Sequence, residues 1–361
     1  MSQEHISQKH MNQTLNMCGS GRISGRNSYP AQHAKRRAQC ILLSLGALLL
    51  ASAWLSLSLG SYPTHPLKVL EALVAPATSD IGFIIWELRL PRIVLAILVG
   101  AALASAGAIL QGIVRNPLAS PDVIGITGGA SVAAVLFLVS LSTTLSMLWL
   151  PVAAILGAFA AALVVFALAW RKGMTPTRLV LVGVGISAAM GAVTTLLIVL
   201  SDDTLAMNAY VWLTGSIYAA QWGDIQGLLP WLVLFIPLAL LHSRHMDTLS
   251  LGDDTATGLG VNVTRSRLLL MICSVALAGS AVAFAGGLSF VGLVAPHIAR
   301  RLIGRGFALL LPVSALVGGL IVLYADLLGR VAFLPRDLPA GIFVSGIGAP
   351  FFVYLLYRIR Q

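Results

Sequence analysis

The feature that most constrains this chain is a series of apolar runs, each close to twenty residues long, separated by short polar connectors. A helix of about 20 apolar residues crosses the hydrocarbon core of a bilayer and satisfies its own backbone hydrogen bonds there. Only 10% of the residues are charged, against roughly 25% in soluble domains. We therefore predict an all-α, polytopic membrane protein with about ten transmembrane helices, over residues 41–60, 93–113, 122–140, 146–169, 177–200, 226–241, 266–285, 288–303, 308–327 and 339–357.

Positive charge alternates along the connectors between these runs. Of the 23 lysines and arginines, all but five lie on alternate connectors or at the two termini; the five are Lys68, Arg89, Arg92, Arg330 and Arg336. The positive-inside rule then predicts a multi-pass inner (plasma) membrane protein with both termini in the cytoplasm. The net charge of +10 reports this topology, and no basic surface interleaved with aromatic residues indicates nucleic acid binding.

Two features within the spans leave alternatives open. The predicted span 288–303 is short and joins its predecessor through Gly286 and Gly287, and if it were re-entrant the C-terminus would lie outside. Small residues form rows within spans, as at Gly100, Ala104 and Gly107. Such rows fit either close packing of helices or the wall of a conduit that slides between states.

The N-terminal segment differs from the rest of the chain. Residues 1–39 are polar, rich in Ser, Asn, Gln and Gly, and hold too few apolar residues to form a core. We predict a disordered cytoplasmic tail over residues 1–39 and a transmembrane domain over residues 40–361. A later translation start, at Met11 or Met17, is the alternative interpretation of this tail.

One outer connector, residues 201–224, is long and aromatic. It carries Trp212 and Trp222, with Tyr210 and Tyr218 nearby. This pattern fits either an aromatic belt at the membrane interface or a short amphipathic helix that roofs a pore.

The longest inner connector covers residues 249–267. Asp253 and Asp254 are typical of a helix start, and Gly258 or Gly260 of a helix stop. We predict a short helix lying across the membrane face, with a plain linker as the alternative.

The chain carries none of the motifs that would give it its own ATPase chemistry. A phosphate-binding loop needs a lysine directly after a glycine, and none of Lys9, Lys35, Lys68 and Lys172 follows one. We predict no catalytic site, no metal site and no cofactor in this chain. The HxxH pair at His242 and His245 is more simply a pair of solvated loop residues than a metal site.

The middles of the predicted spans are almost uncharged. Ion-coupled carriers and proton pumps normally hold ionisable groups at mid-membrane depth. Here the acidic residues of the outer half lie at or near the ends of the spans: Glu71, Asp80, Glu87, Asp202, Asp203, Asp224, Asp326 and Asp337. The energy for transport would then come from another chain, and the inner connector 249–267 suits the docking of a separate ATPase.

Seven segments, in order, resemble the FecCD family, the permease subunits of type II ABC importers for iron-siderophores, haem and cobalamin. They are LRLPR at 88–92, GAILQGIVRNPLASPDVIGITGGA at 107–130, WLTGS at 212–216, LGDDTATGLGV at 251–261, FVGLVAPHIAR at 290–300, LLPVSALVGGLIVLYADLLGR at 310–330 and LPAGIFVSGIGAPFFVYLL at 338–356. The resemblance covers residues 41–361 and makes residues 40–361 a permease domain. It implies a second permease subunit, identical or paralogous, cytoplasmic ATP-binding subunits that hold the ATP and Mg, and a periplasmic or lipoprotein substrate-binding protein.

The resemblance also implies a docking site on the outer face. In that family the arginines that match Arg89, Arg92 and Arg330 pair with glutamates on the two lobes of the binding protein. Neutralisation of nearby Glu87 and Asp326 is the alternative. Surface pairs of this kind are individually weak and set docking register and encounter rate more than affinity. Replacing both Arg89 and Arg92 by Glu is then expected to impair docking and to leave the permease folded.

Three further sites follow from the same resemblance. The cytoplasmic gate corresponds to Asn116, Leu118, Thr175 and Thr177, beside Pro117, Pro121 and Pro176, which interrupt helices as a hinge needs; a plain helix-stop role of the prolines is the alternative. The ATPase-coupling helix corresponds to Leu251, Gly252, Asp253, Asp254, Gly258, Leu259 and Gly260. The periplasmic roof corresponds to Trp212, Gly215, Ser216 and Trp222.

The cargo is the least constrained part of this interpretation. Segment 212–216 resembles the iron-siderophore members more than the cobalamin members, so we expect a ferric siderophore. Haem or cobalamin import by the same mechanism, and an ion-coupled secondary carrier, are the alternatives. The chain departs from the family pattern at Asp253, where Glu is common, and at 336–339, where RDLP replaces a commoner Glu-Leu-Pro.

Overall fold

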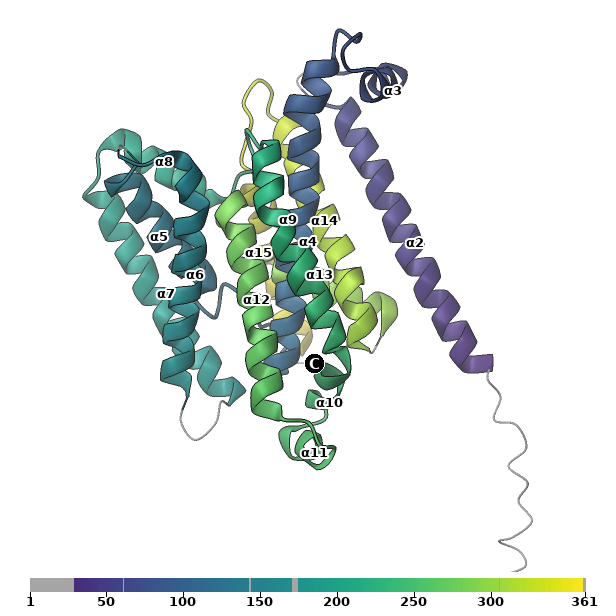
Figure 1. Cartoon of the computed structure of the whole chain (residues 1–361), viewed down its shortest axis with the longest axis vertical. Helices are drawn as coiled ribbons and strands as arrows, with labels where there is room; N and C mark the ends of the chain where they lie inside the picture. Colours follow the sequence, from purple (N-terminus) through teal and green to yellow (C-terminus); the bar gives the residue numbers. More distant parts are fainter. Residues whose placement is uncertain (1–28, 61, 143, 171–174, 305, 360–361) are drawn as a thin grey trace, which may run out of the picture. The chain divides into compact units, whose positions relative to one another are not determined.

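The computed structural model describes residues 29–60, 62–142, 144–170, 175–304 and 306–359, and every regular element among them is a helix. Each of the ten predicted spans is occupied by one (Figure 1): α2 (Tyr29–Ser58), α4 (Leu90–Val114), α5 (Ile126–Ser140), α6 (Leu150–Ala169), α7 (Pro176–Val199), α9 (Trp222–Leu241), α12 (Val263–Ala285), α13 (Val291–Ile303), α14 (Phe307–Val331) and α15 (Ala340–Ile359). Eight of the ten are long and apolar enough to cross a membrane. The two shorter ones are α5 and α13.

Short helices occupy the connectors. They are α3 (Pro66–Val74), η1 (Ile84–Arg89, a π-helix that runs into α4), η2 (Met147–Trp149), α8 (Asp203–Thr214), α10 (Ser243–Leu249) and α11 (Asp253–Gly258). The structure therefore confirms the short helix predicted in connector 249–267, which is α11, and it shows a helix, α8, in connector 201–224, where an aromatic belt and a short helix were both open.

The first helix begins earlier than the sequence analysis expected. Helix α2 starts at Tyr29, inside the segment predicted to be disordered, whereas residues 1–28 lie outside the described residues. Residues 31–39 consist mainly of Ala, Gln, Lys and Arg, which are strong helix formers, so the helix of the first span extends into them. Contacts divide the chain into units 1–40 and 41–361, and the packing described below lies within the second unit.

Helix α4 forms the centre of the second unit. In the apolar window of η1 and α4, 78% of the residues are buried, against 17% for α7. Helices α9, α12, α13 and α14 all contact α4, while α5 to α8 form a neighbouring group that lies side by side in Figure 1. The two ends of α4 are therefore held on several sides.

Glycines bring α4 into backbone contact with its neighbours. A Cβ atom at Gly100 would overlap the carbonyl of Gly318 on α14, and one at Gly107 would overlap the carbonyl of Gly292 on α13. Small residues at such contacts let helices approach closely where lipid provides no hydrophobic drive. This confirms the packing interpretation of the row at Gly100 and Gly107.

A non-helical joint connects α12, which is long enough to cross a membrane, to the shorter helix α13. Helix α12 ends at Gly286, with φ of +70°, and α13 begins only after Phe290, with φ of +65°. Thirteen residues of α13 extend about 20 Å, which is shorter than a bilayer core of about 30 Å. The Gly286 backbone packs against the carbonyl of Trp212 on α8. At the other end, Phe307, which follows α13, bonds to Asp247 on α10. The joint and α13 together therefore take the chain from one end of the bundle to the other.

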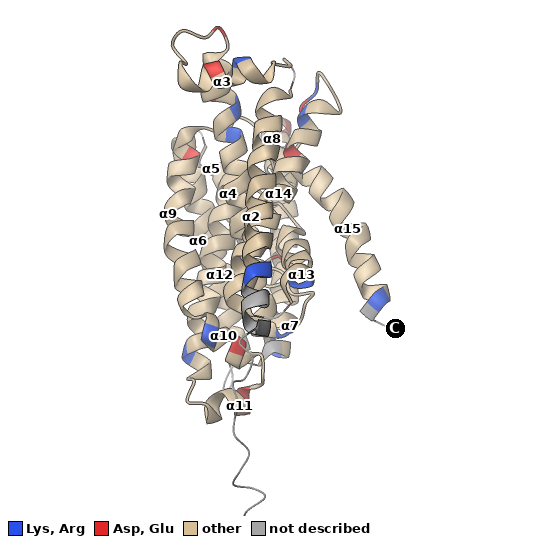
Figure 2. Cartoon of the chain, turned by 90° about the vertical axis from the view of Figure 1, so that its right-hand side faces the viewer, with Lys and Arg blue, Asp and Glu red and all other residues tan. Residues whose placement is uncertain are grey.

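Charge gathers at the two ends of the bundle. Figure 2 shows the middles of the long helices without charged residues. We call the end with Arg89, Arg92 and Arg330 the outer end and the end with α11 the inner end. This arrangement follows from the cost of placing ionised groups at mid-membrane depth.

The backbone contact at Gly107 makes a specific prediction. Gly107→Ala should lower the free energy of unfolding by roughly 1–3 kcal/mol, because the added methyl group meets the Gly292 carbonyl rather than a flexible side chain. The matched control is Gly46→Ala on α2, where no atom lies within 4 Å of a new Cβ. Thermal unfolding of the detergent-solubilised protein measures both, and equal stability of the two variants would contradict the packing role.

Candidate functional site

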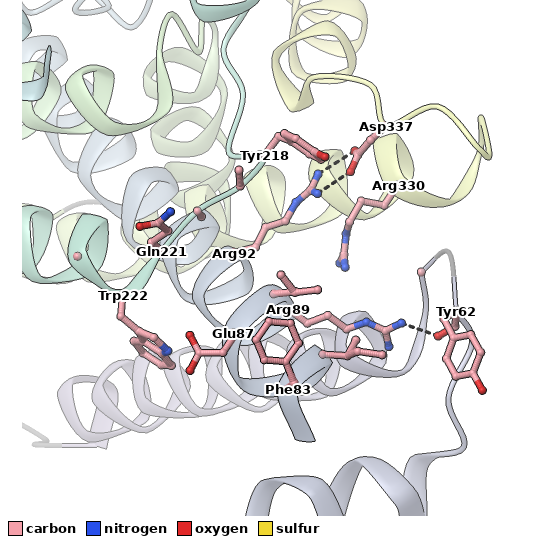
Figure 3. A pocket seen from close by; sticks show the side chains of 16 residues that line it. Tyr62, Phe83, Glu87, Arg89, Arg92, Tyr218, Gln221, Trp222, Arg330 and Asp337 are labelled. Carbon is pink, nitrogen blue, oxygen red and sulfur yellow. Dashed lines mark hydrogen bonds and ion pairs between the residues drawn. The ribbon is translucent and has the colours of Figure 1, made fainter. Parts of the chain in front are cut away.

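The outer arginines are buried in the protein rather than displayed on its surface. Arg89 ends η1, Arg92 lies in the first turn of α4 and Arg330 lies in the last turn of α14. Their exposed fractions are only 6%, 7% and 7%. Figure 3 shows the three side chains converging on one region between these helices.

Arg92 is held by two carboxylates. Its Nε donates to Asp326 Oδ1 at 2.8 Å, and its Nη1 and Nη2 donate to the two oxygens of Asp337 at 2.6 and 2.9 Å. Asp326 is fully buried, and its Oδ2 lies 3.1 Å from Arg330 Nε, close enough for an ion pair but without hydrogen-bond alignment. A two-pronged Arg–carboxylate contact fixes geometry as well as charge.

Arg89 has only neutral oxygens as partners among the described residues. It donates to the carbonyls of Leu57 and Tyr62 and to Thr64 Oγ1, at 2.6, 2.5 and 3.1 Å. Its charge is therefore solvated by the α2–α3 connector but is not neutralised by an acid. Arg330 also donates to Ser56 Oγ, which ties α14 to α2.

A cavity of about 790 Å³ adjoins the three arginines. Its walls come from the α2–α3 connector, η1, residues 218–223 and the ends of α4, α14 and the α14–α15 connector. The charged side chains that line it are the three arginines, Glu87 and Asp337. An incoming anionic group would meet the guanidinium groups inside this cavity.

These contacts sharpen the expectations from the sequence. Asp326 is an ion-pair partner, as the neutralisation alternative stated, whereas Glu87 is exposed and has no ion pair among the described residues. Asp337 was not expected as a partner of Arg92. The double substitution of Arg89 and Arg92 by Glu would place a carboxylate beside Asp326 and Asp337, so these contacts argue against the expectation that this variant stays folded.

The roof residues lie in a tightly packed turn. Gly215, with φ of +82°, ends α8, and its carbonyl accepts a hydrogen bond from Gly341 N at 3.0 Å. Ser216 N donates to the Ala285 carbonyl at 2.8 Å. Trp222 Nε1 donates to the Trp86 carbonyl at 3.0 Å, and the two indole rings lie 6.2 Å apart. The turn thus joins α8 to the α12–α13 joint and to the start of α15.

The residues that the sequence analysis predicted to form a gate lie in two loops at the inner end. Asn116 directly follows Arg115, the left-handed C-cap of α4, and its Oδ1 accepts from Leu118 N at 2.9 Å. Thr175 is the N-cap of α7 and Thr177 lies in its first turn; both are exposed.

The segment predicted to contact the ATPase contains the short helix α11, with an exposed leucine on either side of it. Gly252 precedes α11 with φ of +117°, and Gly260 follows it with φ of +81°. Leu251 and Leu259 are 64% and 65% exposed. Asp254 is exposed, whereas Asp253 pairs with Arg115 and with Arg267, whose Nη2 lies 2.9 Å from Asp253 Oδ1.

Within the described part of the chain, no group of three or more His, Cys, Asp or Glu side chains could hold a metal ion. The rings of His242 and His245 lie 5.4 Å apart, and His242 Nδ1 lies 2.9 Å from the Leu238 carbonyl. His242 is thus tied to the backbone of α9, whereas His245 lies on α10 and its buried Nδ1 has no hydrogen-bond partner among the described residues.

The chain is similar in sequence and in fold to known transport proteins. The model of the FecCD transport family matches residues 48–358. The achromobactin transport system permease protein CbrC of Dickeya dadantii is 51% identical over 314 residues, covering 87% of this chain and 90% of that protein. The iron(3+)-hydroxamate import system permease protein FhuG of Bacillus subtilis is 42% identical over 317 residues, covering 86% and 94%. A solved structure described as an inward-facing conformation of a metal-chelate type ABC transporter is similar with a TM-score of 0.77 and 32% identity, covering 89% of this chain and 99% of that one.

The buried network makes the second prediction. Arg92→Gln should destabilise the protein by about 3–5 kcal/mol, because Asp326 loses its best partner while it stays buried. Adding Asp326→Asn should restore part of that loss, since the unpaired charge is removed. Glu87→Gln, in the same cavity, is the control and should change stability by less than about 0.5 kcal/mol. Thermal unfolding measures all of these; a stable Arg92→Gln protein would refute the network's structural role.

Proposed function

The chain belongs to the FecCD transport family, and we propose that it is the membrane-spanning permease subunit of an ATP-driven importer. It forms the translocation pathway for a ferric siderophore that an extracytoplasmic binding protein delivers. The observation that carries the proposal is the extent of the likeness, because the family model covers residues 48–358. The relatives named for achromobactin and for iron hydroxamate favour a siderophore over haem or cobalamin.

A second permease subunit would complete the pathway. The exposed side of α7 carries small residues at helical spacing, namely Gly185, Ala188, Ala192 and Thr195. Nothing in the described chain lies within 4 Å of a Cβ built on Gly185. Such a row supports close packing against a further helix in lipid. We propose that an identical or paralogous permease lies opposite this face.

The binding protein would dock at the outer cavity. Carboxylates on its two lobes would reach the arginine-lined wall, and Arg89 is the best candidate for the first contact because no acid neutralises it among the described residues. Arg92 and Arg330 already share Asp326. They would hold the wall in place as much as they attract the partner. The roof turn at Trp212, Gly215, Ser216 and Trp222 would then cover the pathway beside this docking site.

ATP binding and hydrolysis would take place in partner subunits at the inner end. The exposed Leu251 and Leu259 flank α11, and apolar residues on a short exposed helix suit a groove in an ATPase. Closure of the ATPases would push α11 and move the gate loops at Asn116, Leu118, Thr175 and Thr177. The two permeases then alternate between outward and inward access as packed bodies. Both termini of the chain lie in the cytoplasm in this proposal.

Reconstitution tests the transport function directly. Proteoliposomes that contain the permease, its partner ATPase and the binding protein should accumulate radioiron-labelled ferric achromobactin or a ferric hydroxamate only when ATP is present. Haem and cobalamin serve as competing cargoes, and uptake of either one alone would reassign the substrate. Uptake that needs no ATP and collapses with an uncoupler would instead identify an ion-coupled carrier.

The docking role makes a separate prediction. Arg89→Gln keeps a polar side chain at this position but removes the charge of Arg89, so it should weaken binding of the binding protein roughly three- to tenfold, with more effect at low salt. Lys68→Gln, an exposed outer cation that does not line the cavity, should change binding little. Surface-based binding measurements over a range of salt concentrations, with thermal unfolding as the check on folding, decide between the two. Equal effects of the two substitutions would show a general charge effect rather than docking at Arg89.

A further inference from the structure

We propose that Asp253 is a positioning residue that connects the coupling helix α11 to the gate loop through Arg115. The proposal rests on the function proposed above, because it takes α11 as the ATPase contact and residues 116–118 as part of the gate. It adds a specific contact by which movement of α11 reaches that loop.

Three helices meet at the Asp253 carboxylate. Asp253 is the first residue of α11, Arg115 is the C-cap of α4 and Arg267 lies near the start of α12. Oδ1 of Asp253 pairs with Nη2 of both arginines. The Arg267 side chain is only 4% exposed, whereas the side chains of Arg115 and Asp253 are 33% and 43% exposed. One end of the cluster is thus anchored in the protein, and the other can respond to a partner at the surface.

Arg115 stands directly before the gate loop. Its φ of 55° and ψ of 33° put a non-glycine residue in the left-handed region, which is uncommon and needs support from its surroundings. The ion pair with Asp253 is one such support. Asn116, Pro117 and Leu118 follow, and Asn116 Oδ1 fixes Leu118 N at 2.9 Å. A displacement of Arg115 is therefore passed to Leu118 through only one turn of chain.

A second contact packs α10, which precedes the coupling segment in the chain, against α4. Met246 on α10 fills the space beside Gly112, where its sulfur would meet any added Cβ. Asp247 Oδ1 accepts from Phe307 N, at the start of α14, at 2.9 Å. Helix α10 is thus braced against α4 and α14. Because α10 is held in place, a displacement of α11 moves the Arg115–Asp253 pair rather than α10.

The neighbouring acid provides a matched control. Asp254 lies beside Asp253 on the same helix and is exposed, with no ion pair among the described residues. Removing either charge changes the net charge of α11 equally. Only the loss of Asp253 breaks the connection to Arg115.

The experiment uses the complete complex of permease, ATPase and binding protein in proteoliposomes, with ferric achromobactin as cargo. Asp253→Asn should keep ATP hydrolysis within about twofold of the parent and lower uptake per ATP hydrolysed by roughly five- to tenfold. Asp254→Asn should change the ratio of uptake to hydrolysis less than Asp253→Asn does, because Asp254 makes no ion pair with Arg115. Asp253→Glu, which keeps the charge, should recover much of the uptake. A merely structural role would lower hydrolysis, assembly and uptake together and would not change the ratio of uptake to hydrolysis.

Arg115→Gln provides the second arm and keeps the test decisive if Asp253→Asn fails to assemble. It should give a similar loss of coupling, and the double variant should be no worse than Asp253→Asn alone, because Asp253→Asn already removes the Arg115–Asp253 contact. Additive losses, or an Asp253→Asn protein that matches Asp254→Asn, would overturn the proposal. A third outcome would also overturn it: the Asp253→Asn complex loses its ATPase, while Arg115→Gln behaves like the parent. Asp253 would then contact the ATPase itself. A parent complex without ATP-dependent uptake would refute the proposed function instead.

Discussion

Backbone packing of α4 against α14 and α13 is the contact on which both ends of this molecule depend. At Gly100 and Gly107 there is no room for a side chain between the helices. In lipid the hydrophobic effect does not drive helices together. The dispersion contacts made at such close approaches therefore stabilise the bundle. The outer end of α4 carries Arg92, and its inner end carries Arg115. The two sites are therefore built on one tightly held helix.

The two ends use charge in different ways. At the outer end, Arg92, Asp326 and Arg330 are buried, and removing one partner of such a network leaves an uncompensated ion, so its geometry is fixed. At the inner end, Arg115 and Asp253 are partly exposed, and exposed pairs rearrange at little cost. A rigid wall suits the reception of a partner, and a rearrangeable pair suits the transmission of a movement.

The sequence predicted the elements better than the contacts between them. The ten apolar runs each became a helix, and the capping residues around Asp253 and Gly260 correctly indicated α11. The N-terminal start of α2 at Tyr29 was missed because low hydrophobicity was taken as disorder, although helix propensity extends through residues 31–39. Helix α13 begins three residues later than predicted, because the chain first passes through positive φ angles at Gly286 and Phe290, which pack against α8 and α15. The role of Asp337 was missed entirely, since the residue lies in an ordinary-looking loop.

The apolar content of a segment, the charge of a connector and the capping residues of a helix are local properties of the chain. The sequence by itself therefore determined an all-α membrane protein, the positions of its helices and the placement of its charges at the two ends. Only the tertiary structure decided which acid neutralises which arginine. Arg92 and Asp337 are 245 positions apart in the chain, and no local pattern relates them. They meet because the packing of α4 on α14 brings the α14–α15 loop over the first turn of α4. The same packing buries the outer arginines, which the sequence could place at the membrane surface but could not assign to its interior.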